Sequence, residues 1–241
     1  MNNINACDAD LKELRNSLST EEYAVALEKI KEGYPIQYLI GNVNFYGNKI
    51  LVNENVLIPR YETEFLVDLI KNKLDKNNSY NILDIGTGSG CISISLSKIF
   101  SNSNITGIDI SNGAIEVANK NKEINNVDNV TFINNDLSNI NSFDGYDIIV
   151  SNPPYVSYNE EVGIETKYEP QNAIFADDNG LYFYKEIIKK ASLSKIKAIF
   201  FEIGANQKEE IYNIKDQYLK EYHIEIFKDL SNKDRYIYIF E

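Results

Sequence analysis

The 241-residue chain has no tryptophan, one histidine, two cysteines and five prolines, and it carries fewer basic than acidic residues. Cys7 and Cys91 cannot form a disulfide framework, so nothing indicates an oxidising compartment. The net charge of −12 argues against wrapping free nucleic acid, which requires a basic face. No apolar run approaches the ~20 residues that span a bilayer, and the polar residues 1–5 do not resemble a signal peptide. These absences predict a soluble cytoplasmic protein without a membrane or nucleic-acid partner.

Residue types that build metal centres and catalytic triads are also scarce. The single histidine, His223, begins a late strand, where such a residue is more often a packing or surface residue than a ligand. Cys91 opens a helix whose dipole could lower its pKa, but with no histidine nearby we interpret it as a packing residue. No spaced pair of carboxylates indicates an acid/base couple. We therefore expect neither a metal site nor a triad.

The first 60 residues differ in pattern from the rest of the chain. Leu11, Leu14 and Leu18 recur at helical spacing, and Ser19 with Glu22 forms a capping-box signature before a second helix. Residues 1–36 are therefore predicted to form a short helical segment. Residues 37–60 alternate with period two, which predicts a β-hairpin with strands at 39–45 and 49–57.

The third predicted region, residues 61–241, has the pattern of an α/β domain. Helices are predicted at 62–74, 91–100, 111–125, 181–193 and 207–222, and a polar linker at 75–79. Strands are predicted at 81–85, 105–109, 130–134, 147–151, 197–203, 223–227 and 236–240. The alternation predicts a doubly wound, mostly parallel sheet. The last two strands are joined only by a turn and must pair antiparallel, as in the Rossmann-like methyltransferase plan.

The most informative residues directly follow the predicted strand at 147–151: Asn152, Pro153, Pro154 and Tyr155. Both prolines have a fixed φ and no N–H, and Pro153 keeps Asn152 out of the helical region. A side-chain amide and two carbonyls are thereby held beside an aromatic ring. We call this segment, residues 152–155, the ledge, and its acceptors predict a binding site for a planar –NH2 group.

A glycine-rich loop lies between the first parallel strand and its helix, where backbone can approach a ligand closely. It consists of Gly86, Thr87, Gly88, Ser89 and Gly90. The spacing is not the G-x-G-x-x-G of dinucleotide enzymes, and a merely tight strand–helix turn is an alternative explanation. Asp109 ends the next strand, where a carboxylate could hold the ribose hydroxyls of either NAD or S-adenosylmethionine. Asp136, past the third strand, is placed to accept from an adenine amino group.

Together the loop, Asp109 and the ledge resemble amino-methyltransferases that use S-adenosylmethionine. Further segments are similar, in the same order, to the release-factor glutamine methyltransferases. These segments are 35–41 (PIQYLIG), 57–64 (LIPRYETE), 168–170 (YEP), 178–181 (DNGL), 201–204 (FEIG), and Asp229 with Asp234 and Arg235. The resemblance covers about residues 35 to 240.

The resemblance implies transfer of a methyl group from S-adenosylmethionine to the side-chain amide nitrogen of the glutamine in the Gly-Gly-Gln motif of peptide chain release factors. It implies that Asn152, Pro153, Pro154 and Tyr155 bind the substrate, with catalytic roles for Asn152, Pro153 and Tyr155. Cofactor contacts map onto residues 86–90, Asp109 and Asn152. The helical segment would dock the release factor, although it is shorter than is usual in the family, and we expect a monomer.

Four alternatives remain at this point. A ribosomal-protein glutamine methyltransferase is a close relative. A nucleic-acid methyltransferase acting on adenine N6 or guanine N2 would use the same ledge, but would be expected to carry a basic groove or a base-flipping module. An NAD-dependent oxidoreductase would need the other glycine spacing. A non-catalytic cofactor-binding module would not explain why loop and ledge occur together.

Overall fold

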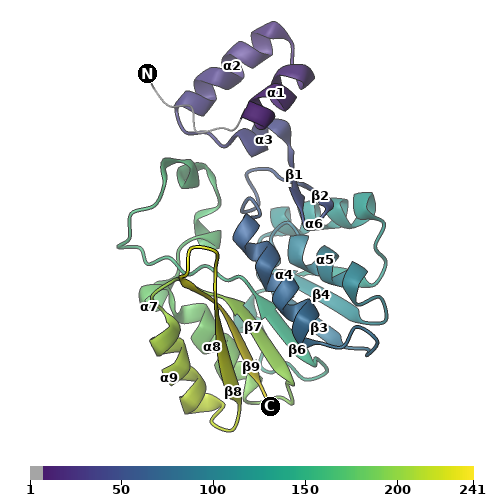
Figure 1. The fold of residues 1–241 in the computed structure, drawn as a ribbon, viewed down its shortest axis with the longest axis vertical. Coiled ribbons are helices and arrows are strands. Elements are labelled where there is room, and N and C mark those ends of the chain that lie inside the picture. Colours follow the sequence, from purple (N-terminus) through teal and green to yellow (C-terminus); the bar gives the residue numbers. More distant parts are fainter. Residues whose placement is uncertain (1–7) are drawn as a thin grey trace.

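The computed structural model describes residues 8–241, so Cys7 and the other residues before Asp8 lie outside the described part. Its centre is a seven-stranded sheet with the order β5-β4-β3-β6-β7-β9-β8 (Figure 1). The strands are β3 (Asn81–Ile85), β4 (Asn104–Asp109), β5 (Val130–Asn134), β6 (Ile148–Ser151), β7 (Ala198–Glu202), β8 (His223–Lys228) and β9 (Asp234–Phe240). The strands from β3 to β7 are parallel, and β9 inserts antiparallel between β7 and β8. The predicted doubly wound sheet with an antiparallel last strand is confirmed.

Helices cover both faces of this sheet (Figure 1). The helices on one face are α4 (Tyr61–Lys73), α5 (Cys91–Ile99) and α6 (Asn112–Asn125), and those on the other are α8 (Tyr182–Ala191) and α9 (Lys208–Tyr218). Ile148 and Val150 pack into the first core and Ile149 into the second, because successive side chains of a strand point to opposite faces. All five helices were predicted to within a few residues.

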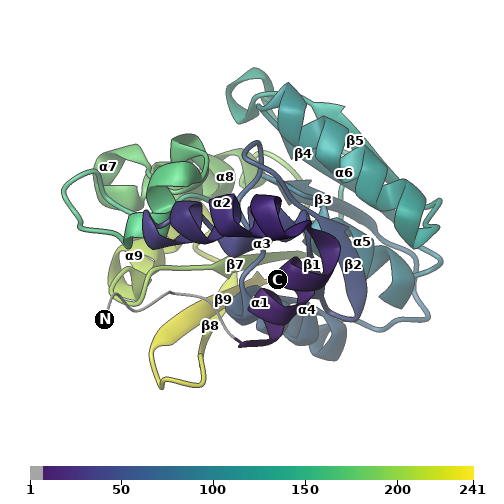
Figure 2. The same cartoon turned by 90° about the horizontal axis from the view of Figure 1, so that it is seen from above.

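The amino-terminal helices form a small body of their own. They are α1 (Asp8–Ser17), α2 (Thr20–Lys31) and α3 (Ile36–Ile40). They lie above the sheet in Figure 1 and in front of it in the view from above in Figure 2. Leu14, Ala26, Ile30 and Ile36 make their shared core. The predicted capping box is present, since Ser19 Oγ accepts from the Glu22 N–H at 3.3 Å and the Ser19 N–H donates to Glu22 at 2.9 Å. Within the described residues no helix is both long and apolar enough to cross a membrane.

The predicted hairpin exists but is shorter than expected. It pairs β1 (Asn42–Phe45) with β2 (Asn48–Leu51) around Tyr46 and Gly47, both of which have positive φ as a two-residue turn of this kind requires. The strand predicted from residue 39 is wrong at its start, because residues 39 and 40 belong to α3 and pack on the helical core. The strand predicted to continue to residue 57 is wrong beyond Leu51. There the Asn53 side chain accepts from the Asn55 N–H at 3.0 Å and begins a turn.

The sequence predicts no helix or strand for the long segment between β6 and α8. This segment contains the short helices η2 (Ile164–Tyr168), η3 (Gln171–Ala173) and α7 (Asp177–Gly180); another, η1 (Leu137–Asn139), follows β5. In Figure 1 this segment rises from the sheet toward the amino-terminal helices. The segment contacts these helices, since the Tyr168 hydroxyl donates to the Glu32 carbonyl at 3.3 Å and the Tyr34 and Tyr168 rings lie 5.1 Å apart. The segment therefore bridges the sheet and the helical body.

Candidate active site

A cavity of about 510 Å³ opens at the carboxyl ends of β3, β4 and β6. Ligands bind at this edge in doubly wound sheets, where neighbouring connections leave in opposite directions. Predicted site residues that line the cavity are Gly86, Gly88, Asp109, Asp136, Asn152, Pro153 and Pro154. Predicted site residues outside its lining are Thr87, Ser89, Gly90 and Tyr155. The cavity thus brings together the loop, both aspartates and the ledge.

The glycine-rich loop presents bare backbone to the cavity. Gly86 and Gly88 have φ of 74° and 55°, and a Cβ at either position would meet nothing within 4 Å. Their lack of a side chain therefore leaves open space above the loop. Gly90 differs, because a Cβ there would lie 2.6 Å from the Phe132 ring. It serves the packing of α5 against the sheet.

Thr87 and Ser89 turn away from the cavity and hold the loop in shape. Both are buried, and the Thr87 hydroxyl donates to Asp84 at 2.7 Å while the Ser89 carbonyl accepts from Asn121 of α6 at 2.9 Å. The loop is therefore fixed from below by β3 and from the side by α6.

Asp109 lies between the loop and the start of α6. One carboxylate oxygen accepts from the Gly88 N–H and the other from the Ser111 N–H, both at 2.9 Å. Burial raises the pKa of Asp109, while these two hydrogen bonds oppose the rise. Each oxygen keeps a further lone pair for a ligand.

Asp136 stands at the beginning of η1 on another wall of the cavity. Its side chain accepts from the Ser138 N–H at 2.8 Å, as an N-cap does. The neighbouring Leu137 is buried and also lines the cavity. The wall thus combines a fixed carboxylate with an apolar surface, which suits an adenine ring and its amino group.

Asp84, at the end of β3, was not predicted as a site residue. One of its carboxylate oxygens accepts from Thr87 and from Ser93, each at 2.7 Å. Among the described residues, the other oxygen is the one buried side-chain polar atom without a hydrogen-bond partner. Burial raises the Asp84 pKa to about 6. Asp84 is fully buried and does not line the cavity, so this carboxylate supports the loop from beneath and does not face a ligand.

The ledge is held from several sides. Ser151 precedes it and donates to the Ile85 carbonyl at 2.6 Å, which ties β6 to β3. The Asn152 amide donates from Nδ2 to the Thr63 hydroxyl at 3.1 Å. The Tyr155 carbonyl accepts from Gln207 at 2.9 Å, and the Tyr155 ring lies 6.0 Å from the Arg235 guanidinium. Burial, with a contribution from the Glu202 carboxylate, raises the Tyr155 pKa to about 12, so this phenol keeps its proton at neutral pH.

Thr63 and Glu202 are parts of the site that sequence reasoning did not single out. Thr63 lies on α4 and Glu202 ends β7, and both are buried beside Asn152. Both belong to segments that carried the resemblance, IPRYETE and FEIG, which was the one available signal. The cavity wall also includes Pro170 of the segment YEP, and Asn55, Tyr182 and Phe183, which no sequence pattern marked.

Other chemistries find no support among residues 8–241. No group of three or more His, Cys, Asp or Glu side chains there could hold a metal ion. The Cys91 thiol is buried and its pKa is raised to about 12, in agreement with a packing role.

Residues 61–171 match the family model described as "MTS: Methyltransferase small domain". Several relatives carry the name "Release factor glutamine methyltransferase", and two of them are 41% identical to this chain. The one from Flavobacterium psychrophilum is 41% identical over 232 residues, covering 90% of this chain and 79% of the relative. The one from Fusobacterium nucleatum is 41% identical over 218 residues, covering 87% of this chain and 60% of the relative.

Among solved structures, the hMettl16 catalytic domain in complex with MAT2A 3′UTR hairpin 6 is similar in fold. Its TM-score is 0.60 at 20% identity, over 81% of this chain and 76% of that one. At that identity the likeness concerns the fold alone, a class I methyltransferase sheet. The identity to the curated relatives, over most of the chain, decides the family: the protein belongs to the release factor glutamine methyltransferases.

Proposed function

We propose that the protein transfers a methyl group from S-adenosylmethionine to the side-chain amide nitrogen N5 of the glutamine in the Gly-Gly-Gln motif of peptide chain release factors. The observation that carries the proposal is the ledge at Asn152, which shares one cavity with the glycine-rich loop and Asp109. The name of the 41%-identical relatives supplies the substrate class.

The cavity residues fit the methyl donor in three respects. Gly86 and Gly88 leave room for a ligand against the backbone. Asp109 retains acceptor capacity for ribose hydroxyls, and Asp136 stands beside an apolar wall suited to adenine. When bound, S-adenosylmethionine supplies a methyl group activated by its sulfonium charge.

The ledge would orient the glutamine amide. An amide nitrogen is a poor nucleophile because its lone pair is delocalised into the carbonyl. In this proposal Asn152 Oδ1 and the Pro153 carbonyl accept its two N–H groups and aim the nitrogen at the methyl group. Pro154 keeps the ledge stiff, and Tyr155, which lies outside the cavity lining, supports the ledge through its packing on the core and its contact with Gln207. Such alignment can supply about 7–11 kcal/mol of the barrier reduction.

No strong general base is required at the start of this reaction. The nitrogen becomes acidic only as the methyl group is transferred, and its proton then passes to water. This agrees with a cavity lining that contains no histidine.

We further propose that the three regions divide the work. Residues 61–241 would form the methyltransferase domain, the hairpin of residues 37–60 would link it, and the helical residues 1–36 would contact the release factor. The enzyme would act as a cytoplasmic monomer without contacting nucleic acid.

A labelling assay tests the proposed function. Purified protein and radiolabelled S-adenosylmethionine are incubated with release factors, with a Gln→Ala variant of the Gly-Gly-Gln motif, with ribosomal proteins and with nucleic acid. We expect label in the release factor and none in its Gln→Ala variant. Label confined to ribosomal protein or nucleic acid, or label that survives the Gln→Ala change, would refute the proposal in favour of one of the alternatives.

A further inference from the structure

A chain of two hydrogen bonds, the first partly buried and the second buried, runs from the ledge into the sheet. Asn152 Nδ2 lies 3.1 Å from the Thr63 hydroxyl, and that hydroxyl lies 2.7 Å from a carboxylate oxygen of Glu202. Thr63 and Glu202 are 3% and 2% exposed. They come from different elements, α4 and β7, and meet because β7 is the parallel neighbour of β6, whose end carries Asn152.

The direction of these hydrogen bonds follows from proton counting. A threonine hydroxyl has one proton to donate and two lone pairs, whereas an ionised carboxylate only accepts. The Thr63 hydroxyl therefore donates its proton in the hydrogen bond to Glu202, and Thr63 can only accept from Asn152. An Asn152 amide that presents its NH2 to Thr63 must present its oxygen on the opposite side. A substrate –NH2 group requires this oxygen as its acceptor. If the Asn152 NH2 faced the cavity instead, two hydrogen-bond donors would face each other.

We propose that Thr63 and Glu202 are positioning residues that set the orientation of the Asn152 amide, so that its oxygen faces the cavity. The expected effect on turnover rests on the proposed function, whereas the orientation of the Asn152 amide does not. Neither residue needs to touch either substrate.

The surroundings of Glu202 make this arrangement responsive to pH. Burial raises the Glu202 pKa to about 7, against the lowering effect of Thr63 and Arg235. The other charged or titratable groups around it are Arg60 and Glu62 at the start of α4, Tyr155 of the ledge, Tyr184 of α8 and Tyr236 of β9.

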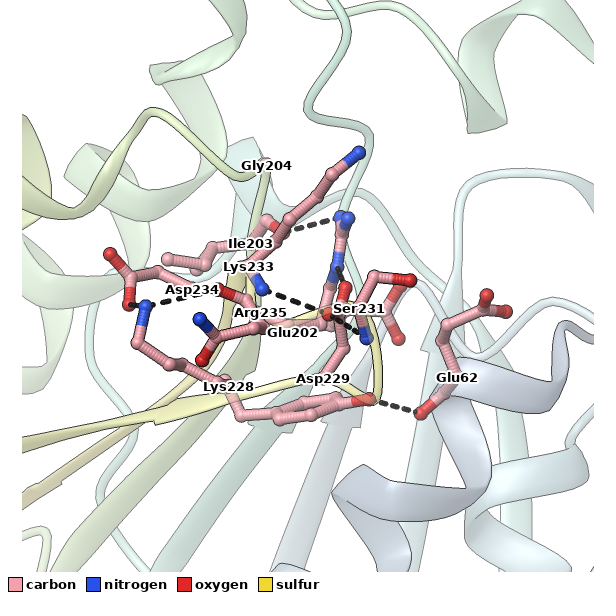
Figure 3. A network of polar contacts seen from close by, with 12 residues as sticks. Glu62, Glu202, Ile203, Gly204, Lys228, Asp229, Ser231, Lys233, Asp234 and Arg235 are labelled. Atoms are coloured by element: carbon pink, nitrogen blue, oxygen red, sulfur yellow. Dashed lines mark hydrogen bonds and ion pairs between the residues drawn. The ribbon is translucent and has the colours of Figure 1, made fainter.

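Arg235 does not neutralise Glu202 by a direct hydrogen bond. Figure 3 shows its guanidinium directed to Asp229 and to the Ile203 carbonyl, at 3.3 and 2.9 Å. A protonated Glu202 can itself donate to Thr63. The Thr63 proton is then free to point at Asn152, and the constraint on the amide is lost.

Three variants test the proposal through turnover at saturating S-adenosylmethionine. Thr63→Val keeps the shape and removes the hydroxyl, and we expect kcat to fall about tenfold, the scale of one hydrogen bond. Thr63→Ser restores the hydroxyl and should recover most of kcat. Affinity for S-adenosylmethionine, measured by calorimetry, should stay within about twofold in both, because Thr63 does not line the cavity. In the wild type kcat should rise as the pH increases through about 7, and Glu202→Gln should abolish that inflection.

A second readout does not depend on activity. The Asn152 side-chain amide signals in ¹⁵N NMR, identified by their loss in Asn152→Ala, should shift with a midpoint near pH 7 in the wild type and not in Glu202→Gln. Signals indifferent to pH, or full turnover in Thr63→Val, would overturn the proposal. If instead the signals titrate as expected while no release factor is labelled, the positioning of Asn152 by Thr63 and Glu202 stands and the proposed function fails.

Discussion

At the scale of single residues, Glu202 shows that this site is not optimised for stability. Its pKa, raised to about 7 by burial, lies above the ordinary 4.5, so the folded protein holds this proton more tightly than the unfolded chain does. The neutral carboxyl therefore stabilises the folded protein fully below about pH 4.5, and this contribution to the unfolding free energy is lost as the pH rises toward about 7.

Glu202→Gln should therefore flatten the pH dependence of stability. We expect wild-type unfolding free energy to drop by up to about 3 kcal/mol between pH 4.5 and 7.5 through this residue, and the variant to lack that component. Urea unfolding at several pH values measures it. Asp84, whose pKa is raised to about 6, titrates in both proteins and provides an internal reference at lower pH. An identical slope in the two proteins would contradict the assignment.

Asn152→Ala should act on turnover rather than on folding. Removal of an aligned hydrogen-bond partner in the transition state costs about 2–4 kcal/mol of barrier, so kcat should fall by about 30- to 1000-fold. Asn213→Ala, on an exposed surface of α9, is the matched control and should leave kcat unchanged. Full activity in Asn152→Ala would remove the ledge from the mechanism.

Asp109→Ala should weaken binding of S-adenosylmethionine by about 10–100-fold, the effect of losing a charged hydrogen-bond acceptor. Since burial raises the pKa of Asp109, affinity in the wild type should also decline on acidification sooner than for an exposed aspartate. Calorimetry at pH 7.5 and 5.5 measures both effects. Unchanged affinity in the variant would argue against the ribose assignment.

At the scale of elements, α7 has a backbone that few sequences could adopt. Asp178, Asn179 and Gly180 all have positive φ, of 56°, 53° and 82°. A Cβ on Gly180 would lie 2.1 Å from the Tyr155 carbonyl oxygen, so this turn presses directly on the ledge.

Gly180→Ala should consequently damage both stability and turnover. The left-handed conformation and the collision together should cost about 2–5 kcal/mol and displace Tyr155. Gly145→Ala is a suitable control, because Gly145 has φ of 92° but open space around it, and should cost only about 1–2 kcal/mol. Thermal unfolding and the labelling assay compare the two. Equal losses in both variants would mean that the contact with Tyr155 is unimportant.

Features formed by adjacent residues could be predicted from the sequence, whereas contacts between distant elements could not. The ledge and the loop were predictable because each depends on adjacent residues following a strand. Thr63 and Glu202 were not, since their partners lie 89 and 139 residues away and no periodic pattern encodes such pairs. Residues 39 and 40 were misjudged because a short apolar run suits a helix or a strand equally well. The segment from β6 to α8 has no periodicity, and tertiary contacts define it.

At the scale of the whole molecule, one buried carboxylate joins regions far apart in the chain. Glu169 is fully buried; it accepts from the Ile58 N–H at 3.0 Å and pairs with Arg60. It thereby joins the segment that carries Pro170, part of the cavity wall, to the start of α4.

Glu169→Gln should loosen this bridge without dissolving the fold. We expect a loss of about 1–3 kcal/mol, and faster hydrogen exchange across residues 156–176. Glu28→Gln removes an exposed ion pair with Lys31 and should change stability by less than about 0.5 kcal/mol. Exchange that stays as slow as in the wild type would show that other contacts hold the segment.

The order of strands in the sheet has a consequence for how such an enzyme can change. The glycine-rich loop follows β3 and the ledge follows β6, and these strands are direct hydrogen-bonded neighbours. Adjacent strands lie about 4.8 Å apart, a spacing that the peptide hydrogen bonds impose whatever the side chains are. If the loop binds the methyl donor and the ledge binds the glutamine, as proposed, this strand spacing sets the distance between the two reactants. Under the proposed function, substitutions in the helical body or the bridging segment would change which polypeptide binds, while the distance over which the methyl group travels would stay the same.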